Sequence, residues 1–245
     1  MAYQGIFRRK EIKYLLDRQK YNEIFRVIGE HMQCDEYGKS LICSLYFDTP
    51  DFRLIRDSIQ KPTTYKEKLR LRSYGTPCDE SIAFAELKKK YKGIVYKRRV
   101  KLPYLRALEW LSSDEKAPED GQIWREIDYF KTFYKDLYPA IAITYERMAY
   151  YSERDEGLRV TFDRNIRYRF ENTDLRLGAD GEELLGEGMY LMEIKIPDAM
   201  PLWLSAALSE CGIYPASYSK YGNAYTRKLL QNIDERVLQN ERTNG

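Results

Sequence analysis

Between residues 66 and 74, basic and aliphatic side chains alternate in the run Lys-Glu-Lys-Leu-Arg-Leu-Arg-Ser-Tyr. Successive side chains of a β-strand point to opposite faces, so the cations at the even positions from 66 to 72 would share one face. Leu69 and Leu71 would lie on the other face. A row of four cations fits either a strand face exposed to water or a site that binds a polyanion.

The same arrangement recurs in other segments, where carboxylates stand among the cations. Glu86 and Lys88 share a face of one predicted strand, and Glu193 and Lys195 share a face of another. Asp163 lies on the charged face of a third. Carboxylates on the same faces can compensate cations that are withdrawn from water. The recurrence therefore favours a polyanion site over simple exposure to solvent.

The charge of the chain is nearly balanced overall but is distributed unevenly. The 245 residues carry a formal net charge of +3, with 43% apolar and 32% charged residues, which is typical of a globular protein. Residues 61–101 contain 13 Lys or Arg against 4 Asp or Glu, a local charge of +9, so the rest of the chain carries −6. A basic segment inside a near-neutral protein indicates a local anionic partner and argues against general adhesion to nucleic acid.

Cysteine and histidine form no recognisable metal-binding pattern. The four cysteines are scattered without a C-x-x-C pair, and His31 is the one histidine. This spacing argues against a zinc site and is typical of reduced thiols. The first residues lack the apolar segment of a signal peptide, and no apolar run is long enough to span a bilayer. We therefore expect a cytoplasmic protein with no membrane segment of its own.

Hydrophobic periodicity predicts helices mixed with strands, and hence an α+β fold. A helix is expected from Asp17, a candidate N-cap, to about His31, and a turn is expected at 36–39. The further predicted helices are 104–111, 123–137, 202–208 and a final one after 221. The predicted strands are 7–15, 41–48, 66–74, 81–89, 94–102, 140–151, 158–168 and 190–196. With no linker or repeat, residues 1–245 are predicted to form a single domain with a frayed tail from about residue 235.

The charged strand faces leave two architectures open. An open sheet could expose its charged face to water while helices cover the other face. Alternatively, an antiparallel sheet closes into a barrel with its apolar faces outward against helices and its charged faces lining the lumen. Unpaired buried charge is costly, so such a lumen requires an anion or interspersed carboxylates. Composition alone does not choose between them.

Eight short motifs, in order over roughly residues 7–226, resemble the VTC domain, the polyphosphate polymerase branch of the triphosphate tunnel metalloenzymes. They are EIKY at 11–14, SLYFD at 44–48, LRLRSYG at 69–75, AELK at 85–88, YER at 145–147, LRV at 158–160, LMEIK at 191–195 and SKY at 219–221. Each motif is weak alone, and their order makes the resemblance specific. The resemblance implies a closed antiparallel β-barrel tunnel with a charged lumen, flanked by helices.

The resemblance also implies roles for individual residues. The catalytic set that grips phosphate would be Lys13, Arg70, Arg72, Lys88, Lys97, Arg147, Arg159 and Lys220. Further substrate contacts would come from Lys68, Lys195, Ser219 and Tyr145. Glu193 would bind Mn²⁺ or Mg²⁺, with Glu11 and Glu86 as helpers. The register at Lys97 stays open, because Arg98 and Arg99 adjoin it.

The activity implied by the resemblance is transfer of the γ-phosphate of ATP to the end of an inorganic polyphosphate chain, with release of ADP. Positioning and charge neutralisation supply most of the rate in phosphoryl transfer, so no protein nucleophile is required. The implied partners are ATP and polyphosphate, not nucleic acid. A separate membrane partner is compatible with the family, and the sequence does not determine the oligomeric state.

Two other functions remain open. A tunnel triphosphatase of the CYTH type would use water in place of the phosphate chain. Those relatives begin with Glu-x-Glu-x-Lys, whereas Arg9 stands in the position of the first glutamate here, which weakens metal binding and favours a longer polyanion. A polyphosphate-binding module without turnover is the second alternative, although the metal-binding glutamate is present at Glu193.

Overall fold

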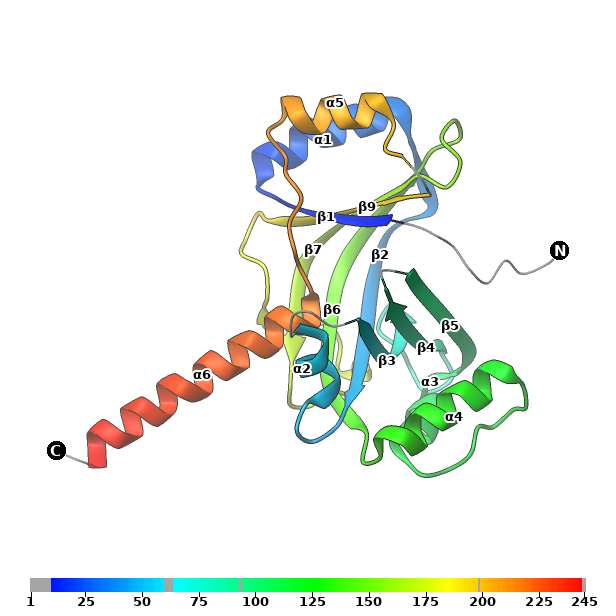
Figure 1. The fold of residues 1–245 in the computed structure, drawn as a ribbon, viewed down its shortest axis with the longest axis vertical. Helices are drawn as coiled ribbons and strands as arrows, with labels where there is room; N and C mark the ends of the chain where they lie inside the picture. The colour runs from blue at the N-terminus through cyan, green and yellow to red at the C-terminus, as the bar shows by residue number, and fades with distance from the viewer. Residues whose placement is uncertain (1–9, 60–63, 93, 198, 244–245) are drawn as a thin grey trace.

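A nine-stranded antiparallel sheet organises the computed structural model, which describes residues 10–59, 64–92, 94–197 and 199–243 (Figure 1). The strands are β1 (Lys10–Leu16), β2 (Gln33–Asp48), β3 (Tyr65–Tyr74), β4 (Ile82–Tyr91), β5 (Ile94–Pro103), β6 (Tyr138–Tyr151), β7 (Arg159–Arg169), β8 (Glu182–Glu183) and β9 (Tyr190–Ile196). The helices are α1 (Arg18–His31), α2 (Arg53–Ile59), α3 (Tyr104–Ser112), α4 (Gln122–Tyr134), α5 (Leu202–Glu210) and α6 (Lys220–Thr243), with a 3₁₀ turn η1 (Leu175–Leu177). The strand order is β1-β9-β7-β6-β2-β3-β4-β5, and β8 pairs with β7.

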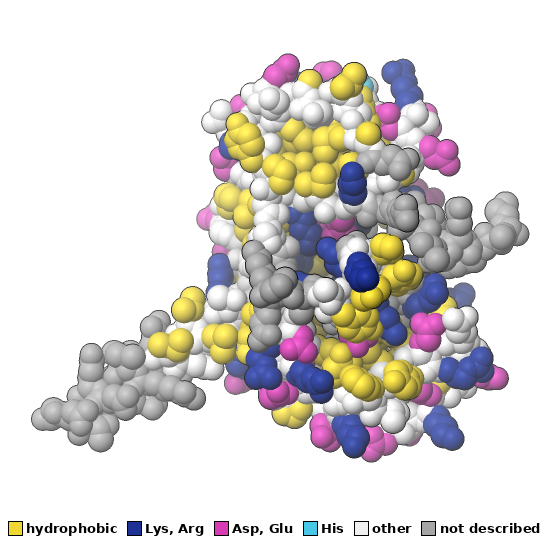
Figure 2. All heavy atoms as spheres, in the orientation of Figure 1, with side chains coloured by type: hydrophobic (Ala, Val, Ile, Leu, Met, Phe, Trp, Pro, Cys, Tyr) yellow, Lys and Arg dark blue, Asp and Glu magenta, His cyan; other side chains and the backbone are white. Residues whose placement is uncertain are grey.

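The prediction of a closed barrel is wrong, because β1 and β5 are the two edges of the sheet formed by the described strands. The sheet nevertheless curls until its ends approach each other, and Lys88 Nζ on β4 lies 3.7 Å from a carboxylate oxygen of Glu11 on β1. Side chains therefore bridge a gap that backbone hydrogen bonds do not. A cavity of about 870 Å³ separates β1 from β3–β5, and basic side chains surround this hollow in Figure 2.

The aliphatic strand faces turn outward and are covered by helices. Leu69 and Leu71 of β3 are fully buried in a core cluster with Trp110 of α3 and Ile127 of α4. At the other end of the sheet, α1 and α5 cover β1, β7 and β9 in a second cluster (Figure 1). The charged faces consequently point to the concave side, as in the second of the two architectures.

A third apolar cluster occupies one end of the concave face. It joins Ile141 and Ile143 of β6 and Leu191 of β9 to Tyr221 of α6. The buried carboxylate of Asp48 anchors both helices there: it accepts backbone N–H bonds from α2 at 2.8 and 3.0 Å, and its Oδ2 accepts the hydroxyl of Tyr221 at 2.8 Å. This packing confines the charged side chains to the remainder of the concave face.

Most predicted elements occur near their expected bounds. Asp17 is the N-cap of α1, since its side chain accepts a hydrogen bond from the backbone N–H of Lys20 at 2.8 Å. The turn predicted at 36–39 is wrong, because β2 runs through it. Gly38 has a φ of 53°, and the pairing with β6 shifts register on either side of it. A glycine in this conformation lets a strand bulge and continue.

Three further expectations concern the first strand, the domain organisation and membrane-spanning segments. Residues 7–9 of the first predicted strand lie outside the described residues. The assignment of residues 1–245 to one domain stays a prediction. Within the described segments, no helix combines the length and apolarity needed to cross a bilayer.

Shortening a buried side chain on the outer face of β3 tests the packing of this core. We expect Leu71→Ala to lower the free energy of unfolding by about 2–5 kcal/mol, because the substitution empties a fully buried position beneath α3 and α4. Urea denaturation followed by circular dichroism measures the change. The control is Leu202→Ala on α5, where the side chain is 88% exposed and the expected change is within about 0.5 kcal/mol. Equal losses in the two variants would contradict the packing.

Candidate functional site

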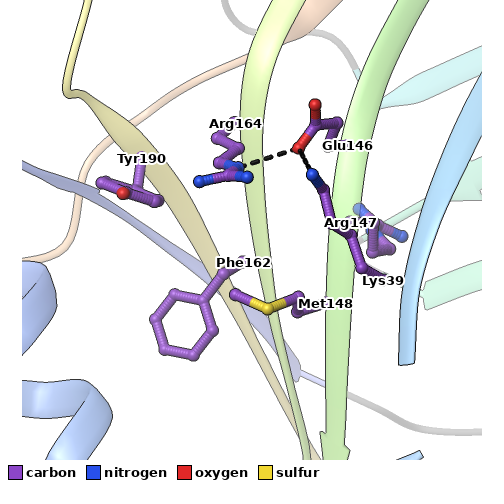
Figure 3. Close-up of a pocket in the computed structure, with 7 residues that line it drawn as sticks. All are labelled: Lys39, Glu146, Arg147, Met148, Phe162, Arg164 and Tyr190. Carbon is purple, nitrogen blue, oxygen red and sulfur yellow. Dashed lines mark hydrogen bonds and ion pairs between the residues drawn. The ribbon is translucent and has the colours of Figure 1, made fainter.

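Charged side chains on the outer face of β6 are matched and form no basic site. The Glu146 carboxylate lies 2.6 Å from Lys39 Nζ and accepts a hydrogen bond from Arg164 at 2.9 Å (Figure 3). It also accepts a hydrogen bond from Asn165 at 3.0 Å. Lys39, Glu146 and Arg164 line a shallow depression beside Tyr190. Because the anion is already fully paired, we place the functional site on the concave face.

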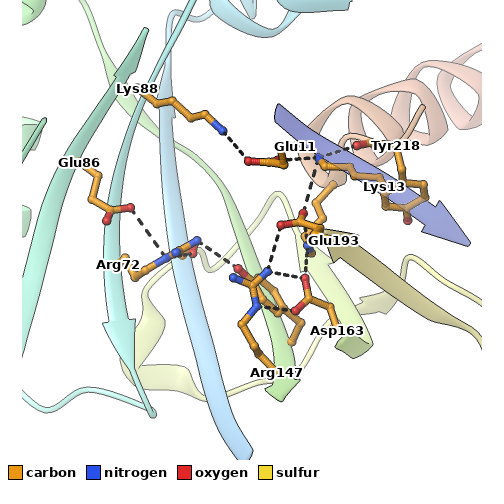
Figure 4. Close-up of polar contacts among 12 residues, drawn as sticks. Glu11, Lys13, Arg72, Glu86, Lys88, Arg147, Asp163, Glu193 and Tyr218 are labelled. Carbon is orange, nitrogen blue, oxygen red and sulfur yellow. Dashed lines mark hydrogen bonds and ion pairs between the residues drawn. The ribbon is translucent and has the colours of Figure 1, made fainter. Parts of the chain in front are cut away.

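The first cluster of the concave face centres on Glu86 of β4 (Figure 4). Its buried carboxylate lies 2.7 Å from Arg70 on β3, 2.5 Å from Lys97 on β5 and 3.9 Å from Arg72. Burial acts to raise the pKa of Glu86, but Arg70, Arg72 and Lys97 together hold that pKa far below its usual range. Glu86 is therefore an ionised anchor for three of the predicted phosphate ligands, and both of its oxygens have cationic partners.

The second cluster centres on Asp163 of β7, which is fully buried. Arg147 donates two hydrogen bonds to its carboxylate, at 2.6 and 2.7 Å, and Lys220 Nζ lies 2.5 Å away. Burial acts to raise the pKa of Asp163, while Lys220 and Arg147 lower it below its usual value. Strand alternation predicts Asp163 on this face, as one of the carboxylates that compensate the cations. Its burial beside two cations is a property of the tertiary structure alone.

Glu193 and Glu11 are held more loosely than these two anchors. Glu193 lies 3.5 Å from Arg147, 3.6 Å from Lys13 and 3.8 Å from Lys220. Glu11 lies 3.7 Å from both Lys13 and Lys88. Charge-assisted hydrogen bonds are shorter, at about 2.7–2.9 Å. Carboxylate oxygens on both side chains therefore have capacity for a further ligand.

The same two carboxylates fit a divalent cation. Lys13 lies within 4 Å of both, so Glu193 and Glu11 face one region of the site. Mg²⁺ and Mn²⁺ prefer oxygen ligands, and Mg²⁺ is commonly held by one or two carboxylates together with phosphate oxygens and water. The described residues contain no group of three or more metal-binding side chains. An ion at Glu193 and Glu11 would consequently depend on bound phosphate and water for its remaining ligands.

Tyr145 of β6 joins the two clusters. Its hydroxyl accepts a hydrogen bond from Arg72 at 3.1 Å, and its ring lies 4.3 Å from Lys220 Nζ and 5.2 Å from the Arg147 guanidinium carbon. Cations over an aromatic face are stabilised by the ring quadrupole. One predicted substrate contact thus also positions cations from β3, β6 and α6.

Tyr46 of β2 is a neighbour that sequence reasoning missed. Its hydroxyl accepts a hydrogen bond from Arg70 at 3.2 Å. Burial acts to raise the pKa of Tyr46, yet Arg70, Arg72 and Lys68 lower that pKa to about 7. A phenol that ionises so readily reports a strongly positive environment. The sequence feature that could have identified Tyr46 is its place in the motif SLYFD, on the same strand face as Ser44.

The remaining predicted residues lie toward the cavity or at the opening of the concave face. Lys68 Nζ is 3.3 Å from Ser219 Oγ, and Lys13 donates to the backbone carbonyl of Tyr218 at 2.9 Å. Lys195 is half-buried, and this burial lowers its pKa. Arg159 pairs in register with Lys195 but is exposed and, among the described residues, has no hydrogen-bond or ion-pair partner. The structure thus brings the inner residues together and leaves Arg159 at the periphery.

The register at Lys97 is the expected one. Lys97 stands opposite Lys88 and contacts Glu86 on the concave face. Arg98 points to the outer face, where it lies 3.7 Å from Glu126 of α4. The catalytic and ligand-binding roles of all these residues stay predictions.

Residues 8–228 match the family model of the VTC domain. The chain belongs to the VTC domain family. Two solved structures share its fold: a Bacillus halodurans protein whose adenylate cyclase assignment is provisional (16% identity, TM-score 0.55, covering 88% of this chain and 96% of that one), and a Vibrio parahaemolyticus protein with the same provisional assignment (11%, 0.51, 91% and 99%). No curated protein matches the sequence. The predicted resemblance to the VTC domain is thereby confirmed.

Removing the charge of Asp163, the buried anion of the second cluster, tests how much this residue contributes to stability. Asp163→Asn should lower the free energy of unfolding at pH 7 by about 3–5 kcal/mol, because Arg147 and Lys220 keep their charges without a buried counterion. The folded-state pKa of Asp163 lies below that of the unfolded chain. Its stabilisation is therefore present above about pH 4 and is lost as the pH falls further.

Urea titrations at pH 7 and pH 3 measure this difference, which should shrink at pH 3. Asp120→Asn is the control, because Asp120 pairs with Arg125 at 2.6 Å but is 89% exposed. Exposed pairs contribute at most about 1 kcal/mol. A loss in Asp163→Asn no larger than in this control would contradict the role of Asp163 as a buried anchor.

Proposed function

We propose that this VTC-domain chain is a metal-dependent polyphosphate polymerase, which transfers the γ-phosphate of ATP to a growing inorganic polyphosphate chain. One observation carries the proposal: cations outnumber carboxylates on a concave face that opens into a cavity of about 870 Å³. The excess positive charge requires an anion, and the space beside it accommodates a long one. ATP and polyphosphate are the proposed substrates, and a membrane partner, where present, would be a separate protein.

The arginines would fix the reacting phosphates. Arg70 and Arg147 are held by Glu86 and Asp163 before any substrate arrives, and Arg72 is held by the hydroxyl of Tyr145. Planar guanidinium groups bind phosphate oxygens bidentately, so a preset orientation reduces the reorganisation needed in the transition state. An oxygen of the terminal phosphate of the chain would attack the γ-phosphorus of ATP. The bond from that phosphorus to the bridging oxygen breaks, and ADP leaves with the electron pair.

Lysines would neutralise the charge that moves during transfer. Lys220 and Lys13 lie beside Glu193, where their ammonium groups can approach incoming phosphate without a fixed planar geometry. Glu193 and Glu11 would hold Mn²⁺ or Mg²⁺. A bound ion of this kind supplies further neutralisation of phosphate charge. Glu86, whose oxygens already contact cations, would position Arg70 and Lys97.

A tunnel triphosphatase is the second candidate, favoured by the proximity of Glu193 and Glu11 around Lys13. In that reaction water would attack the terminal phosphorus of a triphosphate, the bond from that phosphorus to the bridging oxygen would break, and inorganic phosphate and a diphosphate would be released. Arg9, which distinguishes this sequence from the triphosphatases, lies outside the described residues.

The deciding experiment incubates the protein with ATP and Mn²⁺, with and without a short polyphosphate primer, and separates the products on a gel. We expect a ladder of lengthening polyphosphate with a matching release of ADP. Free phosphate without a ladder would instead establish the triphosphatase. Tight polyphosphate binding with no turnover would establish a binding module.

The Glu193→Gln variant sharpens this assay. Its turnover should fall by about 100-fold or more, because the side chain proposed to hold the divalent ion loses its negative charge. Circular dichroism and thermal unfolding verify that the variant is folded. Full polymerase activity in a folded Glu193→Gln protein would contradict the assignment of this residue.

A second prediction concerns the pH dependence of polyphosphate binding. Burial, with repulsion from Lys88, Lys13 and Arg70, lowers the pKa of Lys68 to about 8. Bound phosphate favours the charged form, so affinity is full below that pKa and is lost as the pH rises through it. Between pH 7 and pH 9 this residue alone should weaken binding by about tenfold.

Lys68→Arg keeps its charge and should remove this part of the pH dependence, leaving the share due to Lys97, whose pKa burial also lowers to about 8. Calorimetric titration with polyphosphate at pH 7, 8 and 9 measures the effect. Lys89→Arg, on the outer face of β4, should retain the wild-type profile. If wild type, Lys68→Arg and Lys89→Arg showed the same dependence of affinity on pH, Lys68 would not be the titrating group.

A further inference from the structure

Two aromatic side chains follow the charged residues at one end of the concave face. Tyr74 continues the row of Arg70 and Arg72 on β3, and Phe84 precedes Glu86 on the same face of β4. Tyr74 is 54% exposed and Phe84 is half-buried. Neither ring belongs to the apolar clusters that the described residues form. Core packing therefore does not account for aromatic residues at these positions.

The two rings contact each other and a guanidinium group. The centroids of Tyr74 and Phe84 lie 5.8 Å apart, with the ring planes at 85°. The guanidinium carbon of Arg99 on β5 lies 4.9 Å from the centroid of Phe84. Aromatic rings and guanidinium planes are the surfaces on which proteins stack nucleobases. We call these three side chains the aromatic rim.

Two of the cations at the aromatic rim lack a carboxylate partner. Phe84 stands directly opposite Arg72 on β3 and Lys101 on β5. Arg99 and Lys101 are exposed, and within the described part of the chain neither forms an ion pair. This end of the concave face therefore combines stacking surfaces with free positive charge, which suits a ligand that has both a ring and phosphate groups.

The aromatic rim lies within reach of the arginine centre, which is formed by Arg70, Arg72 and Arg147. Tyr74 is two residues from Arg72, a separation of about 6.6 Å along a strand. Arg72 is in turn opposite Phe84. Phosphates bound at the arginine centre would leave an attached nucleoside beside the rings. An inorganic polyphosphate has no group that could stack there.

We propose that the aromatic rim is a nucleobase subsite, on which the base of ATP stacks while its phosphates bind at the arginine centre. This inference rests on the proposed function and adds to it a way to distinguish the nucleotide donor from the inorganic chain. Stacking tolerates every base, because each base has a π-face. A purine presents a larger ring surface than a pyrimidine, so the rim should favour purine nucleotides without selecting one of them.

The test compares ATP with tripolyphosphate, which share a triphosphate and differ in the nucleoside. Calorimetric titrations with a chelator in place of the divalent metal measure binding in the absence of turnover. In Tyr74→Leu/Phe84→Leu, affinity for ATP should fall by about 10-fold or more, in line with the contribution of one stacked base. Affinity for tripolyphosphate should stay within about twofold of wild type, because no cation is removed.

Tyr129→Leu/Phe133→Leu is the matched control, because it removes two exposed aromatic rings from α4, which covers the outer face of the sheet. The centroids of those two rings lie 6.3 Å apart, a separation similar to that of Tyr74 and Phe84. The control should leave both affinities unchanged. Thermal unfolding without ligand verifies that both double variants are folded.

A series of nucleotides provides a second measurement, which a purely structural role of the rings would not change. Wild type should bind ATP and GTP more tightly than CTP and UTP. In Tyr74→Leu/Phe84→Leu this difference should disappear, because the preference comes from stacking strength. The single variant Phe84→Trp, which keeps an aromatic ring, should retain it.

Equal weakening of ATP and tripolyphosphate, or no weakening of ATP, would overturn the nucleobase subsite. Its failure is separable from failure of the proposed function, since binding is measured without turnover. A wild-type ladder with an unchanged ATP affinity in Tyr74→Leu/Phe84→Leu would leave the polymerase and remove the subsite. Selective loss of ATP affinity in a protein that makes no ladder would support the subsite and remove the polymerase.

Discussion

The cost of gathering like charges in a partly buried space governs the concave face of this sheet. Glu86 and Asp163 reduce that cost at the centre, where each carboxylate is almost fully buried and contacts two or more cations. Removing either anion would leave buried cations without partners, which is more destabilising than never having had the pair. The carboxylates also orient the arginines before a ligand arrives. One set of contacts therefore makes the positive face tolerable and presents it in an ordered form.

The concave face is divided into three regions with different physical properties. Apolar residues, including Ile141 and Ile143, pack against α2 and α6 at one end. The arginine centre beside them contains the buried carboxylates Glu86 and Asp163, whereas the described lining of the lysine-rich cavity beyond it has one acidic residue, Glu11. The lysine-rich cavity lies at the open edge between β1 and β5.

This chain belongs to the VTC domain family, and its fold resembles that of two solved proteins. The fold of this chain is a curled antiparallel sheet whose outer face is covered by helices. The bridge between its ends is an ion pair, Lys88 with Glu11, and not a ladder of hydrogen bonds. An ion pair can exchange one partner for a phosphate group, whereas a backbone ladder would have to break. The edge of the sheet thus offers access without loss of the core.

Local sequence determined the strand faces, because alternation has a period of two and is independent of distant residues. It placed Arg70, Arg72, Glu86 and Glu193 on one side of their strands, and the ordered motifs indicated the family. Local sequence could not determine whether the sheet closes into a barrel, because the distance between β1 and β5 depends on the curl of the whole sheet. The bulge at Gly38 was likewise decided by pairing with β6. Only the tertiary structure separated Glu86, which has cations at 2.5 and 2.7 Å, from Glu11 and Glu193, whose cations lie 3.5 Å or more away. The three residues look alike in sequence, and these distances are set by side chains that come from different strands.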